Sequence, residues 1–133
     1  MDNEIWKPVN QIILKNGTLC NFIGYEVSNY GNVRTYKQRY GKGPKGLLSN
    51  HRPLTGRKDQ KGYPQFWLID INLKGRNFRA HTLVMQTFLG IPKEYEVVCH
   101  NDDVKSNNHI SNLRYDTQLE NVRDIKRNKN ITF

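Results

Sequence analysis

The chain has 133 residues, of which 36% are hydrophobic and 25% are charged, so it can form one domain, or one domain with a small added module. It contains no apolar run of the ~18–20 residues that a membrane span needs, and its N-terminus lacks the basic-then-apolar order of a secretory signal. Its 21 Lys and Arg outnumber its 12 Asp and Glu, giving a net charge of +9. Such a charge is typical of proteins that bind nucleic acid and, less often, of proteins that bind anionic membrane surfaces.

The two cysteines, Cys20 and Cys99, are too few for a disulfide framework, and they form no Cys-x-x-Cys pair. Reduced thiols are the default in the cytosol. We therefore expect a cytoplasmic protein with no membrane partner.

Short strands and turns are predicted for the first part of the chain. Residues 4–14 indicate a turn and a short strand, and Asn16-Gly17 is a hairpin turn signal because both residue types tolerate positive φ. Residues 22–34 have the pattern of short strands on either side of an Asn-Tyr-Gly turn. These patterns predict a small β-rich N-terminal module.

The segment from Arg34 to Lys61 carries most of the excess positive charge, with nine basic residues and Asp59 as its single acid. Several Gly and Pro residues interrupt it, so a loop or an extended arm is predicted. Such a segment suits a phosphate backbone, where the release of counterions favours binding; a solvated basic loop is the alternative. The basic residues are Arg34, Lys37, Arg39, Lys42, Lys45, Arg52, Arg57, Lys58 and Lys61.

The middle of the chain predicts a hairpin followed by a helix. Residues 63–73 alternate apolar and polar side chains, and Lys74-Gly75 turns this strand into a return strand at 77–79. A helix is predicted over residues 80–89, where apolar side chains recur at four-residue spacing.

The last forty residues or so predict a strand, a polar loop, a strand and a helix, in that order. The two strands fall at residues 95–100 and 113–115. Thr117 to Glu120 is a capping-box pattern, which opens a final helix to about residue 127. The chain is therefore expected to have an α+β fold.

Three polar residues of this last segment can carry chemistry. His100 ends the first strand, Asn112 closes the loop, and Asn121 lies one turn into the final helix, at the edge of its buried stripe. This geometry permits His100 and Asn121 to meet in one shallow cleft. A histidine can accept a proton near neutral pH, and an amide oxygen is a hard ligand suited to Mg²⁺ or Mn²⁺. Spacing alone leaves open that His100 is an ordinary surface or half-buried residue.

Residues 97–115, followed by Glu120-Asn121, resemble the signature of the HNH nuclease family, in the variant of phage and intron homing endonucleases whose final histidine is replaced by Asn. Residues 78–88 are similar to the helix that precedes the signature in that group. Residues 4–7 and 25–34 resemble the fourth class of nuclease-associated modular domain (NUMOD), which is commonly found ahead of such units. The order of the two resemblances along the chain also agrees.

The resemblance implies a ββα-metal nuclease unit, also called a His-Me finger. In it, His100 would be the general base that activates water for attack on a DNA phosphate, Asn121 would be a metal ligand, and Asn112 would brace the loop. A divalent ion, most simply Mg²⁺ or Mn²⁺, would stabilise the leaving 3′ oxygen and give 5′-phosphate and 3′-hydroxyl ends. The implied organisation has three parts: a NUMOD-like module at 1–36, a basic linker or arm at 37–62 and an HNH nuclease domain at 63–133.

One position departs from the family's pattern. The residue before the base is often Asp or Asn and helps to hold the metal, but here it is Cys99. A thiolate is a soft ligand that matches Mg²⁺ poorly. Either Cys99 only packs in the interior, or Asp102 or Asp103 supplies the carboxylate, or a softer ion is used. The departure also leaves open an inactive, DNA-binding remnant of such a nuclease.

Further residues allow more than one interpretation. His81 shares a helix face with apolar residues, so it either holds the helix at the edge of the core, or contacts a phosphate, or supports the site. Trp6 and Trp67 are expected in the core, although Trp67 lies on an alternating strand from which it could stack on a base. Further candidates for contacts with DNA phosphates are Arg79, Arg114 and Arg123.

The function expected from these observations is metal-dependent cleavage of double-stranded DNA. A monomer with one active centre would nick one strand, whereas a homodimer could cut both. The alternatives are a non-enzymatic DNA-binding module and a basic RNA-binding or ribosome-associated protein, although no stacking-aromatic signature or RNA motif indicates the latter.

Overall fold

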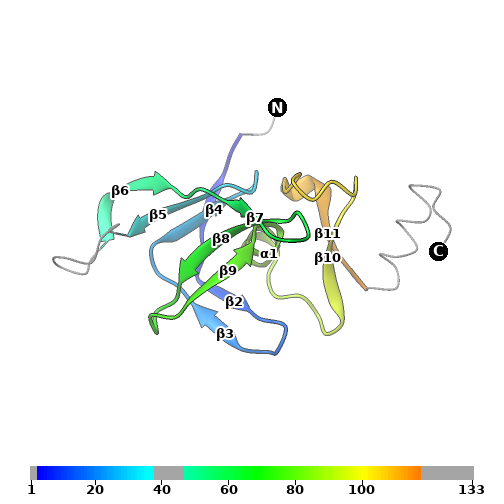
Figure 1. Cartoon of the computed structure of the whole chain (residues 1–133), viewed down its shortest axis with the longest axis horizontal. Helices are drawn as coiled ribbons and strands as arrows, with labels where there is room; N and C mark the ends of the chain where they lie inside the picture. Colours follow the sequence, from blue (N-terminus) through cyan, green and yellow to red (C-terminus); the bar gives the residue numbers. More distant parts are fainter. Residues whose placement is uncertain (1–2, 38–46, 118–133) are drawn as a thin grey trace.

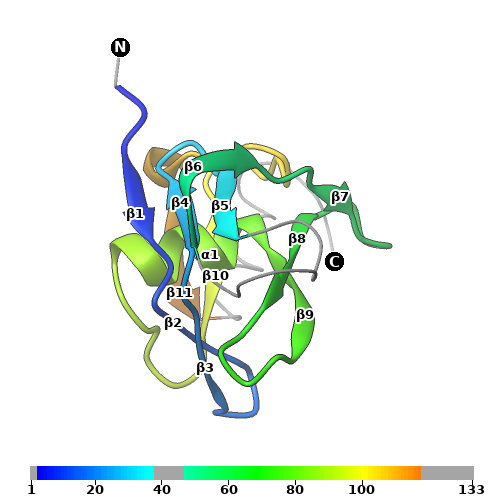
Figure 2. The same cartoon turned by 90° about the vertical axis from the view of Figure 1, so that its left-hand side faces the viewer.

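The computed structural model describes residues 3–37 and 47–117, and these residues form mainly short antiparallel strands with one α-helix (Figure 1, Figure 2). This is the α+β fold expected from the sequence. In the described part of the chain, no helix is long and apolar enough to cross a membrane. The elements are β1 (Trp6–Pro8), β2 (Gln11–Ile13), β3 (Leu19–Asn21), β4 (Tyr25–Ser28), β5 (Val33–Lys37), β6 (Leu47–Pro53), β7 (Arg57–Lys58), β8 (Pro64–Ile69), β9 (Gly75–Arg79), α1 (Ala80–Phe88), β10 (Glu96–His100), the 3₁₀ turn η1 (Ile110–Asn112) and β11 (Leu113–Thr117).

The N-terminal part forms a four-stranded sheet in the order β1-β4-β5-β6, together with the separate β2–β3 hairpin. The Asn-Tyr-Gly turn joins β4 to β5, and its Gly31 has φ +87°, a conformation that side chains rarely adopt. Gly17, with φ +88°, does the same in the turn between β2 and β3. The turns expected at both places are confirmed.

Part of the basic segment expected as a loop or arm is a strand. β6 pairs with β5, so that Thr35 lies opposite Arg52, and β7 pairs with the start of β8. The helix- and strand-breaking residues do not prevent this pairing because they flank the two strands: Pro53 ends β6, and Gly56 lies between β6 and β7.

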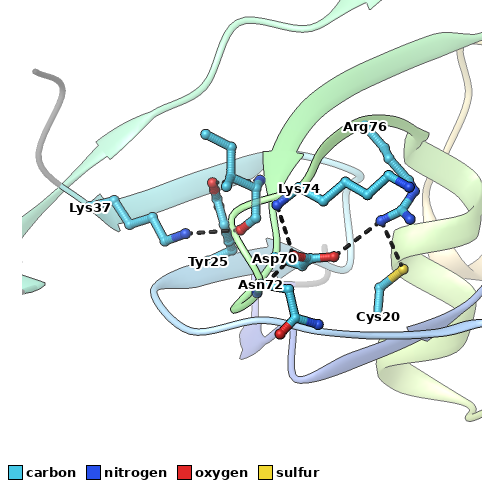
Figure 3. Close-up of polar contacts among 8 residues, drawn as sticks. Cys20, Tyr25, Lys37, Asp70, Asn72, Lys74 and Arg76 are labelled. Atoms are coloured by element: carbon cyan, nitrogen blue, oxygen red, sulfur yellow. Dashed lines mark hydrogen bonds and ion pairs between the residues drawn. The ribbon is translucent and has the colours of Figure 1, made fainter. Parts of the chain in front are cut away.

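β8 and β9 form the expected hairpin, and one carboxylate holds its turn. Asp70 Oδ1 accepts hydrogen bonds from the backbone N–H groups of Asn72 and Lys74, at 2.9 and 3.0 Å. Asp70 Oδ2 accepts from Arg76 at 3.1 Å, and the same Arg76 nitrogen reaches the Cys20 sulfur (Figure 3). These bonds, that from Lys74 first, hold the pKa of Asp70 below its ordinary value. The carboxylate therefore stays charged and the turn stays closed.

The helix α1 is the element around which the sheets assemble. It starts directly after β9 and contacts strands of all four sheets in the described residues. Gln86 ties it to β2, since its side chain bonds both the N–H and the carbonyl oxygen of Ile13. The buried residues of α1 are Ala80, His81, Leu83, Val84 and Met85.

One apolar cluster joins the two ends of the described chain. Ile12 and Val27 from the N-terminal part belong to it, as do Leu68, Met85 and Leu113 from the rest. The core therefore runs across the boundaries that the sequence predicts between its three parts, and those boundaries remain a prediction.

Three expectations from the sequence need correction or cannot be compared with the structure. Trp67 is not in the core: its side chain is 57% exposed, because the alternation of β8 turns Phe66 and Leu68 inward instead. Trp6 is half-buried, with the guanidinium of Arg34 4.1 Å from its ring centre. The helix predicted after Thr117 lies outside the described residues.

Candidate active site

A histidine and an asparagine-rich loop come together at the end of the β10–β11 hairpin. The two strands pair in register, so that His100 lies opposite Leu113, and residues 101–112 connect them. Both strands contact α1, which backs the hairpin (Figure 1). The side chain of His100 is 8% exposed, so the structure places it against the interior rather than on an open surface.

Asn108 holds the ring of His100. The Nε2 atom of His100 lies 2.8 Å from the Oδ1 atom of Asn108, whose side chain is 4% exposed. An amide oxygen only accepts hydrogen bonds, so Nε2 carries the proton in this arrangement and Nδ1 is the basic nitrogen. Nδ1 has no partner among the described residues and is not one of the fully buried atoms that lack one. It therefore retains access to water.

Two aromatic rings pack on His100. The ring of His81, from α1, stands edge-on with 5.2 Å between centres, and the ring of Tyr63 lies at 6.1 Å. Burial, followed by the nearby His100 and Arg79, lowers the pKa of His81 to about 3. His81 is therefore neutral near pH 7 and places no fixed charge beside His100. Its own Nδ1 is buried without a hydrogen-bond partner.

Asn112 bonds across the loop. Its Nδ2 donates to Oδ1 of Asp102 and to the carbonyl oxygen of Asn107, both at 2.9 Å, and its Oδ1 accepts from the Asp102 N–H at 3.2 Å. Asp102 also accepts from the side chain of Asn107 at 2.7 Å and from the Val104 N–H at 2.9 Å. These hydrogen bonds, that from Asn107 first, lower the pKa of Asp102 to about 2. The polar groups of the loop thus hold it in one shape.

The candidate metal ligands differ in the atoms that they could donate to an ion and in their burial. Cys99 is buried, with its sulfur 3.8 Å from the carbonyl oxygen of Val97. Asp102 and Asp103 carry carboxylate oxygens on the loop just beyond the histidine, and a hard divalent ion prefers such oxygens. The loop carboxylates therefore fit the chemistry of such an ion, whereas the thiol does not. Asn121 lies outside the described residues.

No complete metal site is formed by acidic, histidine and cysteine side chains in the part of the chain that the structure describes. Among those residues, no three His, Cys, Asp or Glu side chains gather closely enough to hold an ion. A ligand set drawn from the described loop therefore needs carboxamide or other oxygens in addition.

Two cations flank the Tyr63 ring next to the loop. The guanidinium carbon of Arg79 lies 4.2 Å from the ring centre, and the ammonium of Lys105 lies 4.8 Å from it. Arg79 also forms an ion pair with Asp59 at 2.8 Å, and Lys105 donates to the carbonyl oxygen of Lys61 at 2.6 Å. Two cationic side chains, of which Arg79 is paired with Asp59, thus contact the same tyrosine ring that packs on the histidine.

The other predicted DNA-binding residues are spread over the molecule. Arg34 and Arg114 each form an ion pair with a carboxylate. Lys37 on β5 and Arg52 on β6 belong to strands at the opposite end of the long axis from the β10–β11 hairpin (Figure 1). Arg57, Lys58 and Lys61 are exposed on β7 and the turn that follows it. The candidates that lie outside the described residues are Arg39, Lys42, Lys45 and Arg123.

The Asn-Tyr-Gly turn of the N-terminal sheet lies directly against the loop. The carbonyl oxygen of Asn29 accepts a hydrogen bond from the Ile110 N–H at 2.9 Å. Gly31 faces Asn108 so closely that a β-carbon at position 31 would lie 2.8 Å from the β-carbon of Asn108. The turn thus supports the residue that holds His100.

Sequence reasoning found some of these residues and missed others. It singled out His81, which the structure brings beside His100. It gave no role to Asn108, because a loop with several asparagines does not show by spacing which of them meets the histidine. It also missed Tyr63 and Lys105, which no motif marks and which only the fold brings together.

Comparisons with known proteins identify the class of this site. Residues 78–123 match the family model described as HNH endonuclease. The uncharacterized HNH endonuclease L245 of Acanthamoeba polyphaga mimivirus is 33% identical over 111 residues, which are 84% of this chain and 29% of that protein. A solved structure of the HNH homing endonuclease I-HmuI, described for DNA binding and cleavage, is similar with a TM-score of 0.65 and 28% identity, over 97% of this chain and 62% of that one.

The fold and the matched residues therefore define a nuclease domain. This domain, at residues 78–123, is that of the HNH endonucleases. The resemblance seen in the sequence is confirmed at this level. The chain spans less than a third of the mimivirus relative and about three fifths of the I-HmuI chain. The NUMOD likeness of residues 1–36 stays a prediction.

Proposed function

We propose that this protein is a metal-dependent DNA endonuclease that hydrolyses phosphodiester bonds, with His100 as its general base. The observation that carries the proposal is the hydrogen bond from His100 to Asn108 inside the HNH domain. It fixes the imidazole ring and leaves Nδ1 to take a proton from water. The neutral ring of His81 favours this role, because a second positive charge there would hinder protonation of His100 during the reaction.

The proton movements of the proposed reaction are simple. A water molecule transfers a proton to Nδ1 of His100 while its oxygen attacks the phosphorus. The Nε2 atom keeps its own proton and its bond to Asn108, whose oxygen stabilises the imidazolium that forms. The bond from phosphorus to the 3′ oxygen breaks, and the leaving oxygen takes a proton from solvent water, which gives a 5′-phosphate and a 3′-hydroxyl end.

HNH nucleases generally use a divalent metal ion. When bound, such an ion stabilises the negative charge that develops on the leaving oxygen. In this chain we propose Asn121 and a carboxylate of Asp102 or Asp103 as its ligands, and Mg²⁺ or Mn²⁺ as the ion, because all of these donors are oxygens. Asn112 contributes by fixing the loop through its bonds to Asp102. Cys99 is a packing residue in this proposal.

Double-stranded DNA is the proposed partner. Arg79 and Lys105 would bind phosphates next to the bond that is cut, since both lie on the Tyr63 ring beside the histidine. The NUMOD-like residues 1–36 would add further contacts with the DNA. A cytoplasmic location and, for cutting both strands, a homodimer complete the proposal.

Nicking of a supercoiled plasmid by the purified chain tests the proposal. We expect cutting with Mg²⁺ or Mn²⁺ and none with EDTA, and we expect His100→Ala to lower the rate by roughly 10²–10⁴-fold without weakening DNA binding in a gel-shift assay. His51→Ala is the matched control, because it removes an exposed histidine of β6 that packs on Tyr36. It should cut at the wild-type rate. A wild-type protein that never nicks DNA with either ion would refute the proposal.

A catalytically inactive DNA-binding protein is the second candidate. One observation favours it: a buried thiol, Cys99, stands directly before His100, where the family pattern often has a metal-binding Asp or Asn. Isothermal calorimetry separates the two candidates. Binding of DNA with no binding of Mg²⁺ or Mn²⁺ would favour the inactive protein.

A further inference from the structure

A groove outside the HNH site has no part in the proposed chemistry. It opens between the N-terminal sheet and β8 and has a volume of about 280 Å³. Its walls come from β4, β5, β6 and β8, and of these β5 and β6 reach the end of the molecule opposite the β10–β11 hairpin (Figure 1). Its walls contain two cations, two aromatic rings and no acid: Tyr25, Thr35, Lys37, Arg52, Leu54, Thr55, Trp67 and Ile69.

Trp67 forms one wall of the groove. Its ring lies so close to Gly75 of the paired strand β9 that a β-carbon at position 75 would overlap the indole. The glycine therefore lets the ring rest on the backbone of β9, and the side chain is still 57% exposed. A ring that is supported on one side and open to solvent on the other is suited to stacking on a second flat ring.

Lys37 and Arg52 supply the positive charge of the groove. The ammonium of Lys37 donates to the carbonyl oxygen of Ile69 at 2.9 Å and lies 4.7 Å from the ring centre of Tyr25 (Figure 3). The Nε atom of Arg52 is buried without a hydrogen-bond partner, and Arg52 forms no ion pair with the residues that the structure describes. An anion in the groove would give Arg52 the partner that the protein does not supply, and it would give the Lys37 ammonium a counter-charge in addition to its bond to Ile69.

We propose that this groove binds one nucleotide unit of a DNA strand, with its base stacked on Trp67 and its phosphate held by Lys37 and Arg52. An aromatic platform beside cations is the combination by which proteins hold single-stranded nucleic acid. The volume is near the lower limit of the ~300–1,000 Å³ of small-molecule sites, which suits one unpaired base. The inference rests on DNA being the partner in the proposed function, but it does not require that the DNA is cut.

Fluorescence of Trp67 gives the direct test. Trp6 and Trp67 are the two tryptophans of the chain, so Trp6→Phe leaves Trp67 as the single reporter. In EDTA, a short single-stranded oligothymidylate should quench this fluorescence. A strand of the same length built from abasic sites carries the same phosphates without bases, so it should bind without quenching.

Affinity measurements with the same two strands separate stacking from charge. Trp67→Ala should weaken binding of oligothymidylate about tenfold and leave binding of the abasic strand unchanged, while Trp67→Phe should restore most of the loss. Leu73→Ala is the matched control, because Leu73 is an exposed apolar residue of the same hairpin outside the groove. Lys37→Gln and Arg52→Gln should each reduce the slope of log affinity against log salt by about 0.7 for both strands.

Two results would overturn the inference: no quenching by oligothymidylate, or a Trp67→Ala variant that loses the same affinity for both strands. The binding measurements in EDTA need no cleavage. A protein that fails to nick DNA can therefore still show the stacking, and a protein that nicks DNA can still lack it.

Discussion

The loop of the β10–β11 hairpin and the groove beside Trp67 differ in how completely their polar groups are paired. In the loop, the side chain of Asp102 bonds those of Asn107 and Asn112, and His100 is held by Asn108. In the groove, an Arg52 nitrogen lacks a partner and an indole faces solvent. This difference agrees with the two proposed roles, because a site for chemistry needs its groups fixed before the ligand arrives, whereas a site for binding can leave groups that the ligand itself completes.

The two regions do not differ in how their turns are held. Asp70 closes the β8–β9 turn and Asp102 closes the loop of the β10–β11 hairpin, and each accepts several hydrogen bonds from neighbouring groups. Those bonds lower the pKa of both carboxyl groups. The difference in how completely polar groups are paired therefore comes from the other side chains of the two regions. Substitutions of those side chains can test it.

Removal of the carboxamide of Asn108 should have the largest effect on the nicking rate among the changes in and around the β10–β11 loop. We expect Asn108→Ala to slow nicking about a hundredfold with DNA binding retained, because a displaced base loses the reactive geometry. Asn108→Asp keeps the acceptor oxygen and adds a negative charge, which favours the protonated form of the histidine beside it. The acid limb of the pH–rate profile of this variant should therefore move to higher pH. A pH–rate profile identical to that of the wild type would contradict a positioning role for Asn108.

The next largest effect is expected when the contact between the N-terminal turn and the loop is disturbed. Gly31→Ala places a side chain at φ +87° and against Asn108, so it should destabilise the fold by about 1–3 kcal/mol and also slow nicking. Gly17→Ala is the matched control, because Gly17 has φ +88° and open space around it. Urea unfolding should show a loss of stability in both variants, larger in Gly31→Ala because of its added contact with Asn108. Nicking should be slower only in Gly31→Ala. Equal rates would mean that the contact does not matter.

The neutral state of His81 can be measured through the pH dependence of stability. The pKa of His81 falls from 6.5 to about 3 on folding, so between these values the unfolded chain binds a proton that the folded chain does not. Stability should therefore fall as the pH drops, by about 2 kcal/mol from this group between pH 7 and pH 5. Urea unfolding at both pH values should show the loss in the wild type and a smaller one in His81→Phe. An equal loss in both proteins would exclude His81 as its source.

The smallest expected effect is on the salt dependence of DNA affinity, when a cation next to the β10–β11 loop is removed. Lys105→Gln removes one proposed phosphate contact, so the slope of log affinity against log salt should fall by about 0.9 for duplex DNA. The cleavage rate at saturating DNA should change little. Lys93→Gln, which removes an exposed lysine before β10, is the control. The same slope in both variants would remove Lys105 from the interface.

The elements of the fold that depend on local patterns were predictable from the sequence. The Asn-Tyr-Gly turn, the β8–β9 hairpin and α1 each follow from neighbouring residues. The pairing of β6 with β5 was not predictable, because a basic segment rich in breakers carries no sign of its partner. The exposure of Trp67 was missed for a related reason: alternation shows that Trp67 and Leu68 face opposite sides, but not which side the rest of the chain covers.

The candidate site divides in the same way. His100 and Asn112 could be singled out because the motif that marks them lies within one hairpin. Asn108 needed the actual path of the loop, and Tyr63 and Gly31 come from distant parts of the chain that only the fold brings near. The meeting of His100 with Asn121 stays a prediction, since Asn121 lies outside the described residues.

The close approach of Gly31 to Asn108 also limits how such a protein can evolve by recombination. If the HNH domain were fused to a foreign N-terminal segment, the loop that carries Asn108 would lose the surface on which it rests, unless the new segment also placed a glycine at that point. We therefore expect the two parts to be inherited together, and chimaeras that separate them to need repair at this contact before they regain full activity.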